Sequence, residues 1–264
     1  MATRTAEEQM PRPIGPTIPR WQLGEQLSRL REEAKITQST AADTLGCSLS
    51  KIQKIEAGDV GIVRAELAAL LDLYHVTDQH MRDQLLELQK LGKQRGWWSK
   101  FGQVPSPFAT FLGLESAATT IKVFEPLMVH GLLQTEDYAR AIAETCNVDL
   151  PEDQVERQVR IRMARQQEVL AEDAPTLWVI LDEAVLHREI GSKRVMAAQL
   201  KHLGEWTKKI TLQVVPFRQG GYPGILGAFT IFEFQEQTHS PVAYVEGQAP
   251  LQPVSGTRDG RSPE

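Results

Sequence analysis

The sequence predicts a mainly α N-terminal domain of five helices, followed by a C-terminal α+β domain with a small β-sheet. Through residue 95, apolar residues recur at the spacing of one helix face. Beyond residue 96, helical segments alternate with short runs rich in β-branched and aromatic residues, which are typical of strands. The chain has 264 residues, 41% of them hydrophobic, so it is long and apolar enough for two cores.

The N-terminal part begins with a proline-rich segment. Residues 1–19 hold four prolines and few apolar side chains, so we expect a disordered arm. The first domain then spans residues 20–95. We expect its helices at residues 20–34, 38–45 and 49–57, a fourth with Leu67, Leu70 and Leu71 on its inner face, and a fifth at about 78–94.

The second domain is predicted at residues 96–247, with the boundary near Gly96. Helices are expected at residues 108–124, after Thr135, and at 151–171 and 195–208, with an extended piece at 127–129 and strands at 177–181, 210–215, 229–234 and 242–246. Residues 248–264 show no helical periodicity and almost no apolar side chains, so we expect a disordered tail.

Composition excludes several classes of protein. No stretch approaches the ~20 apolar residues of a membrane span, and residues 1–16 lack the apolar core of a secretory signal. We therefore expect a cytoplasmic protein associated with the nucleoid. Cys47 and Cys146 lack CxxC spacing, so we expect buried thiols in a reducing compartment. The six histidines show no HxxxH or HExxH spacing, and we expect no metal and no cofactor.

The net charge of -5 is unevenly distributed. Residues 1–95 hold 13 basic and 13 acidic side chains, whereas residues 96–264 hold 16 basic and 21 acidic. The bulk basic field that usually accompanies nucleic-acid binding is therefore missing. Any contact with DNA must come from a locally organised surface.

Residues 37–58 predict such a surface. Thr37 and Ser48 are good N-caps for two short helices, and Gly46 and Gly58 follow the last periodic residue of each. Two short helices joined by a turn with glycine can cross so that the outer face of the second enters a major groove. An ordinary helical hairpin in a bundle is the alternative.

The segment LREEAKITQSTAADTLGCSLSKIQKIEAG, residues 30–58, resembles the helix-turn-helix of the XRE (lambda repressor and Cro-like) family of bacterial regulators. The matching positions are Thr37, Gln38, Ala42, Gly46, Ser48, Ile52, Glu56 and Gly58. The resemblance implies a five-helix lambda-repressor-like fold that binds double-stranded DNA, usually as a homodimer on an operator with two half-sites about one helical turn apart.

The resemblance implies that Gln38 hydrogen-bonds a phosphate and that one face of the second helix enters the groove. Helical geometry agrees, because residues 49, 50, 53 and 54 lie opposite Ile52 and Ile55. Leu49 can only touch a thymine methyl or a sugar. Isolated surface lysines are usually just solvated, but Lys35, Lys51 and Arg64 are natural phosphate partners. The candidate DNA-binding residues are Lys35, Gln38, Ser48, Leu49, Ser50, Lys51, Gln53, Lys54 and Arg64.

The second domain also resembles a known family. The strings GLLQTEDYARA, LDEAVLHREIG, VVPFRQGGYPGILGAFTIFEF and AYVEG, between about residues 97 and 247, are similar to the domain of unknown function DUF5753 of actinobacterial regulators. This resemblance implies regulation of development or secondary metabolism, with a small DUF397-type protein as a possible partner. We expect the tail after Gly247 to diverge from the family.

The second domain contains several candidate residues for ligand binding or catalysis. Trp97 and Trp98 could stack on a ligand or cover the seam between the domains. Arg162, Arg165 and Gln166 are candidates for an anionic ligand or partner, with solvated or locally paired arginines as the alternative. Asp182 and Glu183 could form a paired-carboxylate site, or a cap and a first-turn acid of the following helix. Glu246 could be a catalytic glutamate.

We therefore expect a sequence-specific DNA-binding transcriptional regulator whose C-terminal domain senses a ligand or a small partner protein, and not an enzyme. The alternative is a toxin-like or enzymatic effector, possibly nucleotide-transferring, whose helix-turn-helix autoregulates its operon. A convergent set of titratable residues would favour this alternative, and the sequence gives none.

Overall fold

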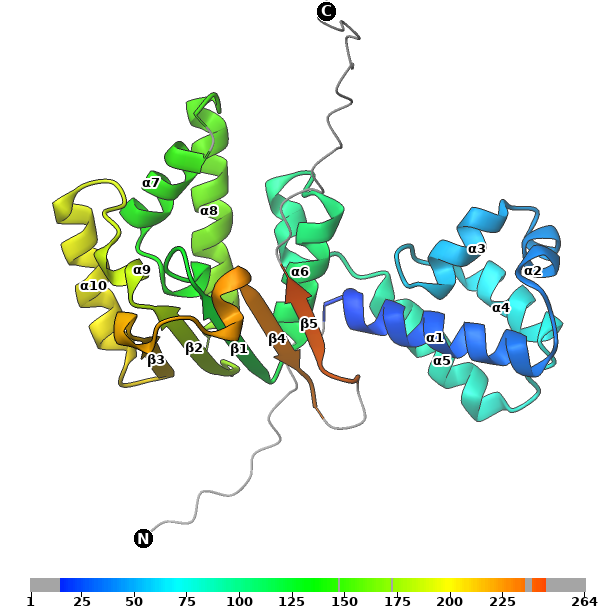
Figure 1. Ribbon diagram of the computed structural model, residues 1–264. Helices are drawn as coiled ribbons and strands as arrows, with labels where there is room; N and C mark the ends of the chain where they lie inside the picture. The colour runs from blue at the N-terminus through cyan, green and yellow to red at the C-terminus, as the bar shows by residue number, and fades with distance from the viewer. Residues whose placement is uncertain (1–14, 147, 172, 236–238, 246–264) are drawn as a thin grey trace, which may run out of the picture.

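The computed structural model describes residues 15–146, 148–171, 173–235 and 239–245. The chain forms a helical N-terminal lobe and a larger lobe in which helices pack on a sheet (Figure 1). Both parts of the predicted fold class are confirmed. Residues 1–14 of the expected arm, Glu246 and the expected tail lie outside the described residues.

Residues 17–92 form the five predicted helices, which are α1 Thr17–Glu33, α2 Gln38–Leu45, α3 Leu49–Glu56, α4 Arg64–Leu73 and α5 Gln79–Gly92. Helix α1 begins at Thr17, so the prediction that residues 17–19 belong to a disordered arm is wrong. Pro16 is its N-cap and Pro19 lies in its first turn. Prolines are tolerated there because the first N–H groups of a helix have no intrahelical acceptor.

The C-terminal lobe contains, within residues 97–245, a five-stranded sheet of order β3-β2-β1-β4-β5. Strand β1 pairs in parallel with β2, as β2 does with β3, whereas β4 is antiparallel to both β1 and β5. The strands are β1 Thr120–Glu125, β2 Thr176–Asp182, β3 Thr211–Val215, β4 Phe229–Glu233 and β5 Val242–Val245.

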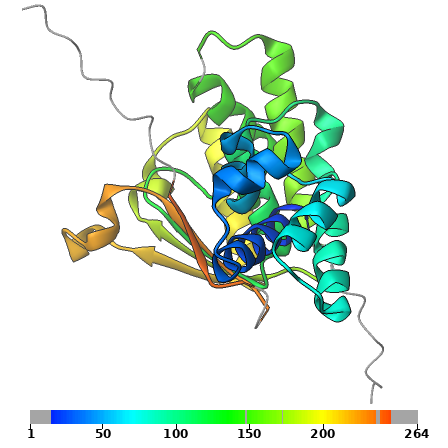
Figure 2. The same cartoon turned by 90° about the vertical axis from the view of Figure 1, so that its right-hand side faces the viewer.

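Five α-helices and four short 3-10 helices accompany this sheet within the described residues. They are η1 Trp97–Phe101, α6 Ser106–Ala117, η2 Gly131–Leu133, α7 Glu136–Cys146, α8 Glu152–Val169, α9 Ala184–His187, α10 Lys193–Trp206, η3 Phe217–Gln219 and η4 Pro223–Leu226. In the view from the N-terminal lobe, the strands lie along one side of the C-terminal lobe and the segment with η3 and η4 projects beyond them (Figure 2).

The single helix expected at residues 108–124 is wrong. The chain leaves the helix after Ala117 and forms β1, the central strand, from Thr120 to Glu125. The β-branched Thr120, Ile121 and Val123 fit a strand better than a helix. The extended piece expected at residues 127–129 contains no strand.

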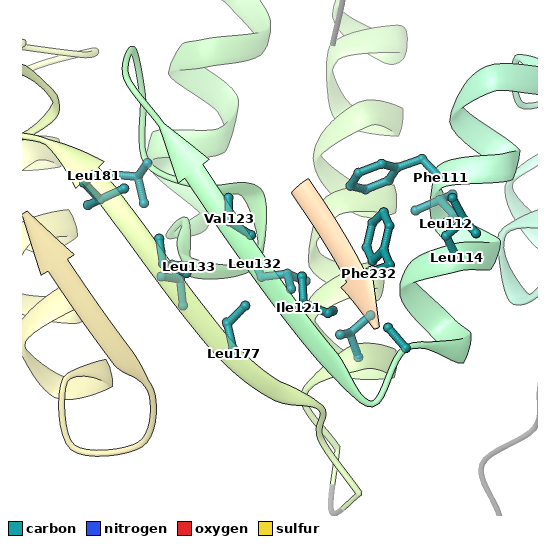
Figure 3. Packing of buried hydrophobic residues seen from close by; sticks show 14 of the residues in the cluster. Phe111, Leu112, Leu114, Ile121, Val123, Leu132, Leu133, Leu177, Leu181 and Phe232 are labelled. Carbon is teal, nitrogen blue, oxygen red and sulfur yellow. The ribbon is translucent and has the colours of Figure 1, made fainter. Parts of the chain in front are cut away.

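The core of this lobe lies between the inward face of the sheet and the helices. Ile121, Val123, Leu177 and Phe232 point into it (Figure 3). Phe111 of α6 meets Phe232 edge to face, with ring centroids 5.4 Å apart. Such an aromatic contact adds to the free energy gained by burying both rings. Helix α6 is thereby tied to β4.

Helix α1 joins the two lobes because its residues belong to both cores. Ile18 is fully buried in the core of the C-terminal lobe, whereas Leu23 and Leu27 belong to the N-terminal core. Trp98 is buried at this junction, and the Trp97 indole donates to Ser116 of α6 at 3.3 Å. These positions favour the interpretation that both tryptophans pack at the boundary between the two domains.

The prediction that both cysteines are buried is wrong. Cys47 is half-buried and Cys146 is exposed, and both are free thiols. Cys47 lies in the turn between α2 and α3, and Cys146 is the last residue of α7. Positions at the ends of elements lie at the surface more often than residues inside them.

We predict that Gly113→Ala lowers the stability of the protein by about 1 to 3 kcal/mol. A Cβ at Gly113 would overlap the Cβ and Oγ1 of Thr17, so α6 and α1 would have to move apart. Gly204→Ala in α10 is the matched control, since its Cβ meets nothing within 4 Å. Alanine at position 204 should increase the free energy of unfolding by about 0.5 to 1 kcal/mol, because a glycine inside a helix is less stable than an alanine by that amount. Equal denaturant midpoints for the two variants would contradict close packing of α1 on α6.

Candidate nucleic-acid interface and ligand cavity

Local hydrogen bonds fix the starts of α2 and α3, and a glycine ends α2. The Thr37 hydroxyl accepts from the Thr40 N–H at 3.0 Å, and the Ser48 hydroxyl accepts from the Lys51 N–H at 3.2 Å. Gly46 ends α2 in the left-handed region with φ 61°. Both predicted N-caps and the predicted glycine are confirmed. Ser48 therefore holds the start of α3, whatever contact it makes with DNA.

A buried ionic network fastens the other end of α3. The Arg31 guanidinium donates to the Glu56 carboxylate from Nε at 2.7 Å and from Nη2 at 2.9 Å. The Gln38 amide donates to the same carboxylate at 2.8 Å. An amide nitrogen carries two hydrogens, so this bond orients Gln38 and leaves the second hydrogen to donate elsewhere. The predicted phosphate contact of Gln38 stays a prediction.

The ionisation of Glu56 depends on these partners. Burial opposes the charged form, but the hydrogen bonds from Arg31 and Gln38 outweigh it and lower the pKa of Glu56 below its ordinary value. The charged carboxylate is therefore the form that holds α1, α2 and α3 together.

The predicted recognition face of α3 is directed to solvent. Ser50, Gln53 and Lys54 are exposed, and Leu49 is 45% exposed, whereas Ile52 and Ile55 are buried. A leucine this exposed contributes little to the core. Leu49, Ser50, Gln53 and Lys54 therefore lie together on the solvent-exposed face of α3.

The predicted phosphate partners differ in their surroundings. The Lys51 ammonium lies 2.5 Å from the Glu66 carboxylate, and this hydrogen bond raises the pKa of Lys51. Within the described residues, exposed Lys35, Lys54 and Arg64 form no ion pair. Lys51 is thus paired with an acidic side chain of the protein. This contact between α3 and α4 was not predicted from the sequence.

Two neighbouring cavities lie beside α6 and α8, with volumes of about 100 and 330 Å³. Phe108, Arg162 and Arg165 line both. Two of the three residues expected to meet an anionic ligand therefore face the same space. Gln166 lines neither cavity, because its amide donates to the carbonyls of Gly131 and Gln134, both at 2.8 Å.

A buried polar network borders the smaller cavity. The Arg165 guanidinium donates twice, each time at 2.6 Å, to the carboxylate of Glu115, which is fully buried. Arg165 Nη2 also lies 3.3 Å from His130 Nε2, and His130 Nδ1 lies 3.0 Å from the Glu125 carboxylate. Arginine can only donate, so Nε2 accepts and Nδ1 carries the proton toward Glu125. Glu115 and His130 are not among the site residues predicted from the sequence.

The two tryptophans lie away from these cavities. Trp98 lines a separate groove of about 460 Å³ between the lobes, together with Arg20, Lys93 and Arg95. Trp97 lines neither of the two cavities beside α8. The structure therefore places the two tryptophans and the arginine pair at different sites.

Asp182 and Glu183 make structural hydrogen bonds. One Asp182 oxygen accepts from the Ala184 N–H at 2.8 Å, and the other accepts from the Tyr222 hydroxyl at 2.5 Å. Burial, together with the hydrogen bond to Asp182, raises the pKa of Tyr222 to about 12. Glu183 accepts from the Phe217 N–H at 2.7 Å. Asp182 thus accepts the first N–H of α9 from the last position of β2. Glu183 is the N-cap of α9 without a side-chain cap hydrogen bond, so the prediction of Asp182 as cap and Glu183 as first-turn acid is wrong in its positions.

Within the described residues, no three His, Cys, Asp or Glu side chains are placed to hold a metal ion. The same part of the chain contains no helix of the length and apolarity needed to cross a membrane.

Comparison with known proteins finds two families. The model of a helix-turn-helix domain matches residues 22–85. The model of the domain of unknown function DUF5753 matches residues 108–261, which is more than half of the chain and extends past the point where we expected the resemblance to end. No curated protein and no solved structure matches the chain.

We predict that Glu56→Gln destabilises the protein by about 3 kcal/mol at neutral pH, because it removes the buried charged partner of Arg31 and leaves only the exposed Glu32 near it. Since the folded-state pKa of Glu56 is lowered, its stabilising effect is complete above the ordinary glutamate pKa of about 4.3 and is lost as pH falls through the lower folded value. Urea unfolding at neutral and acidic pH measures this difference.

The control for this experiment is Glu32→Gln. Glu32 also lies near Arg31, at 3.5 Å, but its side chain is 69% exposed, so the substitution should have almost no effect at either pH. A Glu56→Gln deficit that does not shrink in acid would contradict the assigned role.

Proposed function

The chain belongs to the DUF5753 family and carries a helix-turn-helix domain, which suggests a DNA-binding regulator; from this premise we propose that it is a sequence-specific transcriptional regulator. The observation that carries the proposal is the exposed face of α3. Ser50, Gln53 and Lys54 share that face on a helix held at one end by the Ser48 cap and at the other by the Arg31–Glu56 pair. A rigid helix with an exposed polar face suits base recognition in a major groove.

We further propose that the C-terminal domain is the sensor and that the protein binds its operator as a homodimer. The two cavities beside α8 support a ligand-sensing role, since apolar walls and a few convergent polar groups are typical of small-molecule sites. Trp178 and Val245 remain 39% and 66% exposed on the outward face of the sheet, which favours self-association. A DUF397-type partner, a role in development or secondary metabolism and a cytoplasmic location stay predictions from the sequence.

We also propose that the protein is not an enzyme. In support, the carboxylates singled out in the described part of the C-terminal lobe accept bonds from structural partners. Asp182 accepts from the Ala184 N–H at the start of α9, and Glu183 accepts from the Phe217 N–H at the start of η3.

The test of the function is selection of DNA sites from a random pool with the purified full-length protein, followed by measurement of affinity for the selected site and for scrambled DNA. A selected site should show two related half-sites about one helical turn apart. Enrichment of no sequence would overturn the proposal.

We predict that Gln53→Ala weakens binding to the selected site by about 1 to 3 kcal/mol and relaxes its sequence preference, because a base-edge contact is lost. Arg64→Ala should instead weaken binding to all sequences alike and lower the salt slope by about one unit, as for a phosphate contact. Lys201→Ala, on the exposed surface of α10, removes the same charge far from α3 and should change neither quantity. Identical behaviour of the three variants would show that α3 does not read the bases.

We predict that Glu66→Gln strengthens binding to scrambled DNA and steepens its salt dependence, because it releases Lys51 from its ion pair. Glutamine keeps an acceptor for the Val63 N–H, which donates to Glu66 at 3.4 Å, so the start of α4 is preserved. Asp83→Asn on α5 is the control, since it also removes an acidic charge from the N-terminal lobe. An equal salt slope for both variants would show that Lys51 does not reach phosphate.

A further inference from the structure

We propose that the groove between the two lobes binds a nucleoside monophosphate, a molecule with a flat base and a phosphate monoester. The groove encloses about 460 Å³ and shares no described lining residue with the cavities beside α8. Its walls come from α1, the turn after α3, the segment that leads from α5 into η1, and α6. It is a second site, so the inference goes beyond the proposed function.

Arg20 brings a guanidinium to this groove without a charged partner. Its Nε donates to the carbonyl oxygen of Gly92 at 2.6 Å, and its Cγ lies only 3.0 Å from where a Cβ on that glycine would be, so its stem is held in place. Among the described residues, the guanidinium forms no other hydrogen bond and no ion pair. Burial lowers the pKa of Arg20, as expected for a cation that lacks an anion. The two terminal nitrogens can therefore donate to two oxygens of a phosphate.

The other charges of the groove favour a dianion. Lys93 and Arg95 also line it, and both are exposed and form no ion pair with any described residue. Asp59 is the one acid among the described lining residues. Three positive charges against one negative charge leave a net charge of +2. A phosphate monoester carries about −1.5 to −2 at pH 7 and balances this charge, whereas a carboxylate would balance only half of it.

The size and walls of the groove favour a nucleoside as the body of the ligand. Sites for small organic molecules usually enclose about 300 to 1,000 Å³, and the groove lies within this range. Trp21 and Trp98 line it, and Trp21 is only half-buried. Aromatic side chains of this kind stack on nucleic-acid bases. Ser106 and Thr110 of α6 add hydroxyl groups, which can both donate to and accept from a base or a ribose.

The position of the groove favours a free nucleotide over the phosphates of a duplex. Asp59 of the N-terminal lobe and Ala109 of the C-terminal lobe line the same hollow. A small molecule inside it contacts both lobes, whereas the broad outer surface of a duplex would meet only the rim. Small-molecule sites are common at such boundaries between domains.

The groove also borders the helix that we assign to base recognition. Gly58 and Asp59 line it shortly after α3, which ends at Glu56. Trp21 packs so closely on Gly58 that a Cβ there would lie 2.4 Å from its ring. A bound nucleotide therefore favours one position of the turn after α3, which couples nucleotide affinity to DNA affinity. This last step rests on the proposed DNA-binding function.

The experiment uses the full chain and the 5′-monophosphates of adenosine, guanosine, cytidine and uridine, each measured separately. Titration calorimetry should give a dissociation constant below about 1 mM for at least one of them. The matching neutral nucleoside should bind at least about tenfold weaker, because the charge-assisted hydrogen bonds are lost. Inorganic phosphate should also bind at least about tenfold weaker, because it has no base to stack. Equal affinity of the monophosphate and either comparison, or no binding of any monophosphate at about 10 mM, would overturn the inference.

Paired substitutions locate the site. Lys93→Gln with Arg95→Gln removes two exposed positive charges from the groove and should weaken the monophosphate about tenfold or more. Lys90→Gln with Arg194→Gln removes the same charge from exposed positions outside the groove and should leave the affinity within about twofold. Equal losses in both double variants would overturn the assignment to this groove. The comparison of nucleotide with nucleoside uses the unaltered chain, so it remains decisive if a variant fails to fold.

Binding to scrambled DNA distinguishes the two sources of phosphate. Both double variants should show the same salt slope, because the groove takes the phosphate of a free nucleotide. A lower slope for the groove variant than for its control would show that DNA phosphates occupy the groove, and would overturn the assignment of a small molecule.

Operator binding is measured with and without the monophosphate. A change in operator affinity of about threefold or more supports the coupling, and an unchanged affinity with the monophosphate bound overturns it. Failure to bind any operator would remove the proposed regulatory function and leave the nucleotide site standing, since the calorimetry contains no DNA. Failure of every monophosphate to bind would do the reverse.

Discussion

Helix α1 is shared by both hydrophobic cores, and the placement of both candidate sites depends on this constraint. Ile18 packs in the C-terminal core and Leu27 in the N-terminal core, although both belong to one uninterrupted helix. Close contacts flank it on either side. The carbonyl of Glu56 at the end of α3 approaches Gly24 so closely that no Cβ fits, and α6 approaches α1 at Gly113 in the same way. Because packed helices resist continuous deformation, a shift at one contact is transmitted to the other.

The DNA-binding half could be predicted almost entirely from the sequence, because its signals are local. The caps at Thr37 and Ser48 and the glycine at position 46 act within three or four residues along the chain. The pairing of Lys51 with Glu66 could not be predicted in this way. It joins residues 15 positions apart, and their contact depends on how α3 crosses α4.

The C-terminal half was harder to predict because its central elements are defined by distant partners. Strand β1 pairs with β2, about 56 residues later, and with β4, more than 100 residues later. Ile121, Val123 and Phe124 are all buried, so the strand lacks the clean alternation that separates a strand from a helix. The same reason hid Glu115, because a lone acid in an apolar helix gives no sign of the arginine 50 positions away that pairs with it.

The Glu115–Arg165 pair contributes less to stability than to placement. Removing two charges from water costs most of what their attraction returns, so an apolar pair of similar shape would stabilise the lobe about as well. What the apolar pair could not do is hold a guanidinium against the ring of Phe111, 4.9 Å away, at the wall of a cavity. The carboxylate of Glu115 fixes the orientation of the Arg165 guanidinium. The contact of His130 Nδ1 with Glu125 orients the imidazole whose Nε2 faces Arg165. Such a network is favoured where the position of a charge matters more than the free energy of folding, which is the requirement of a ligand site.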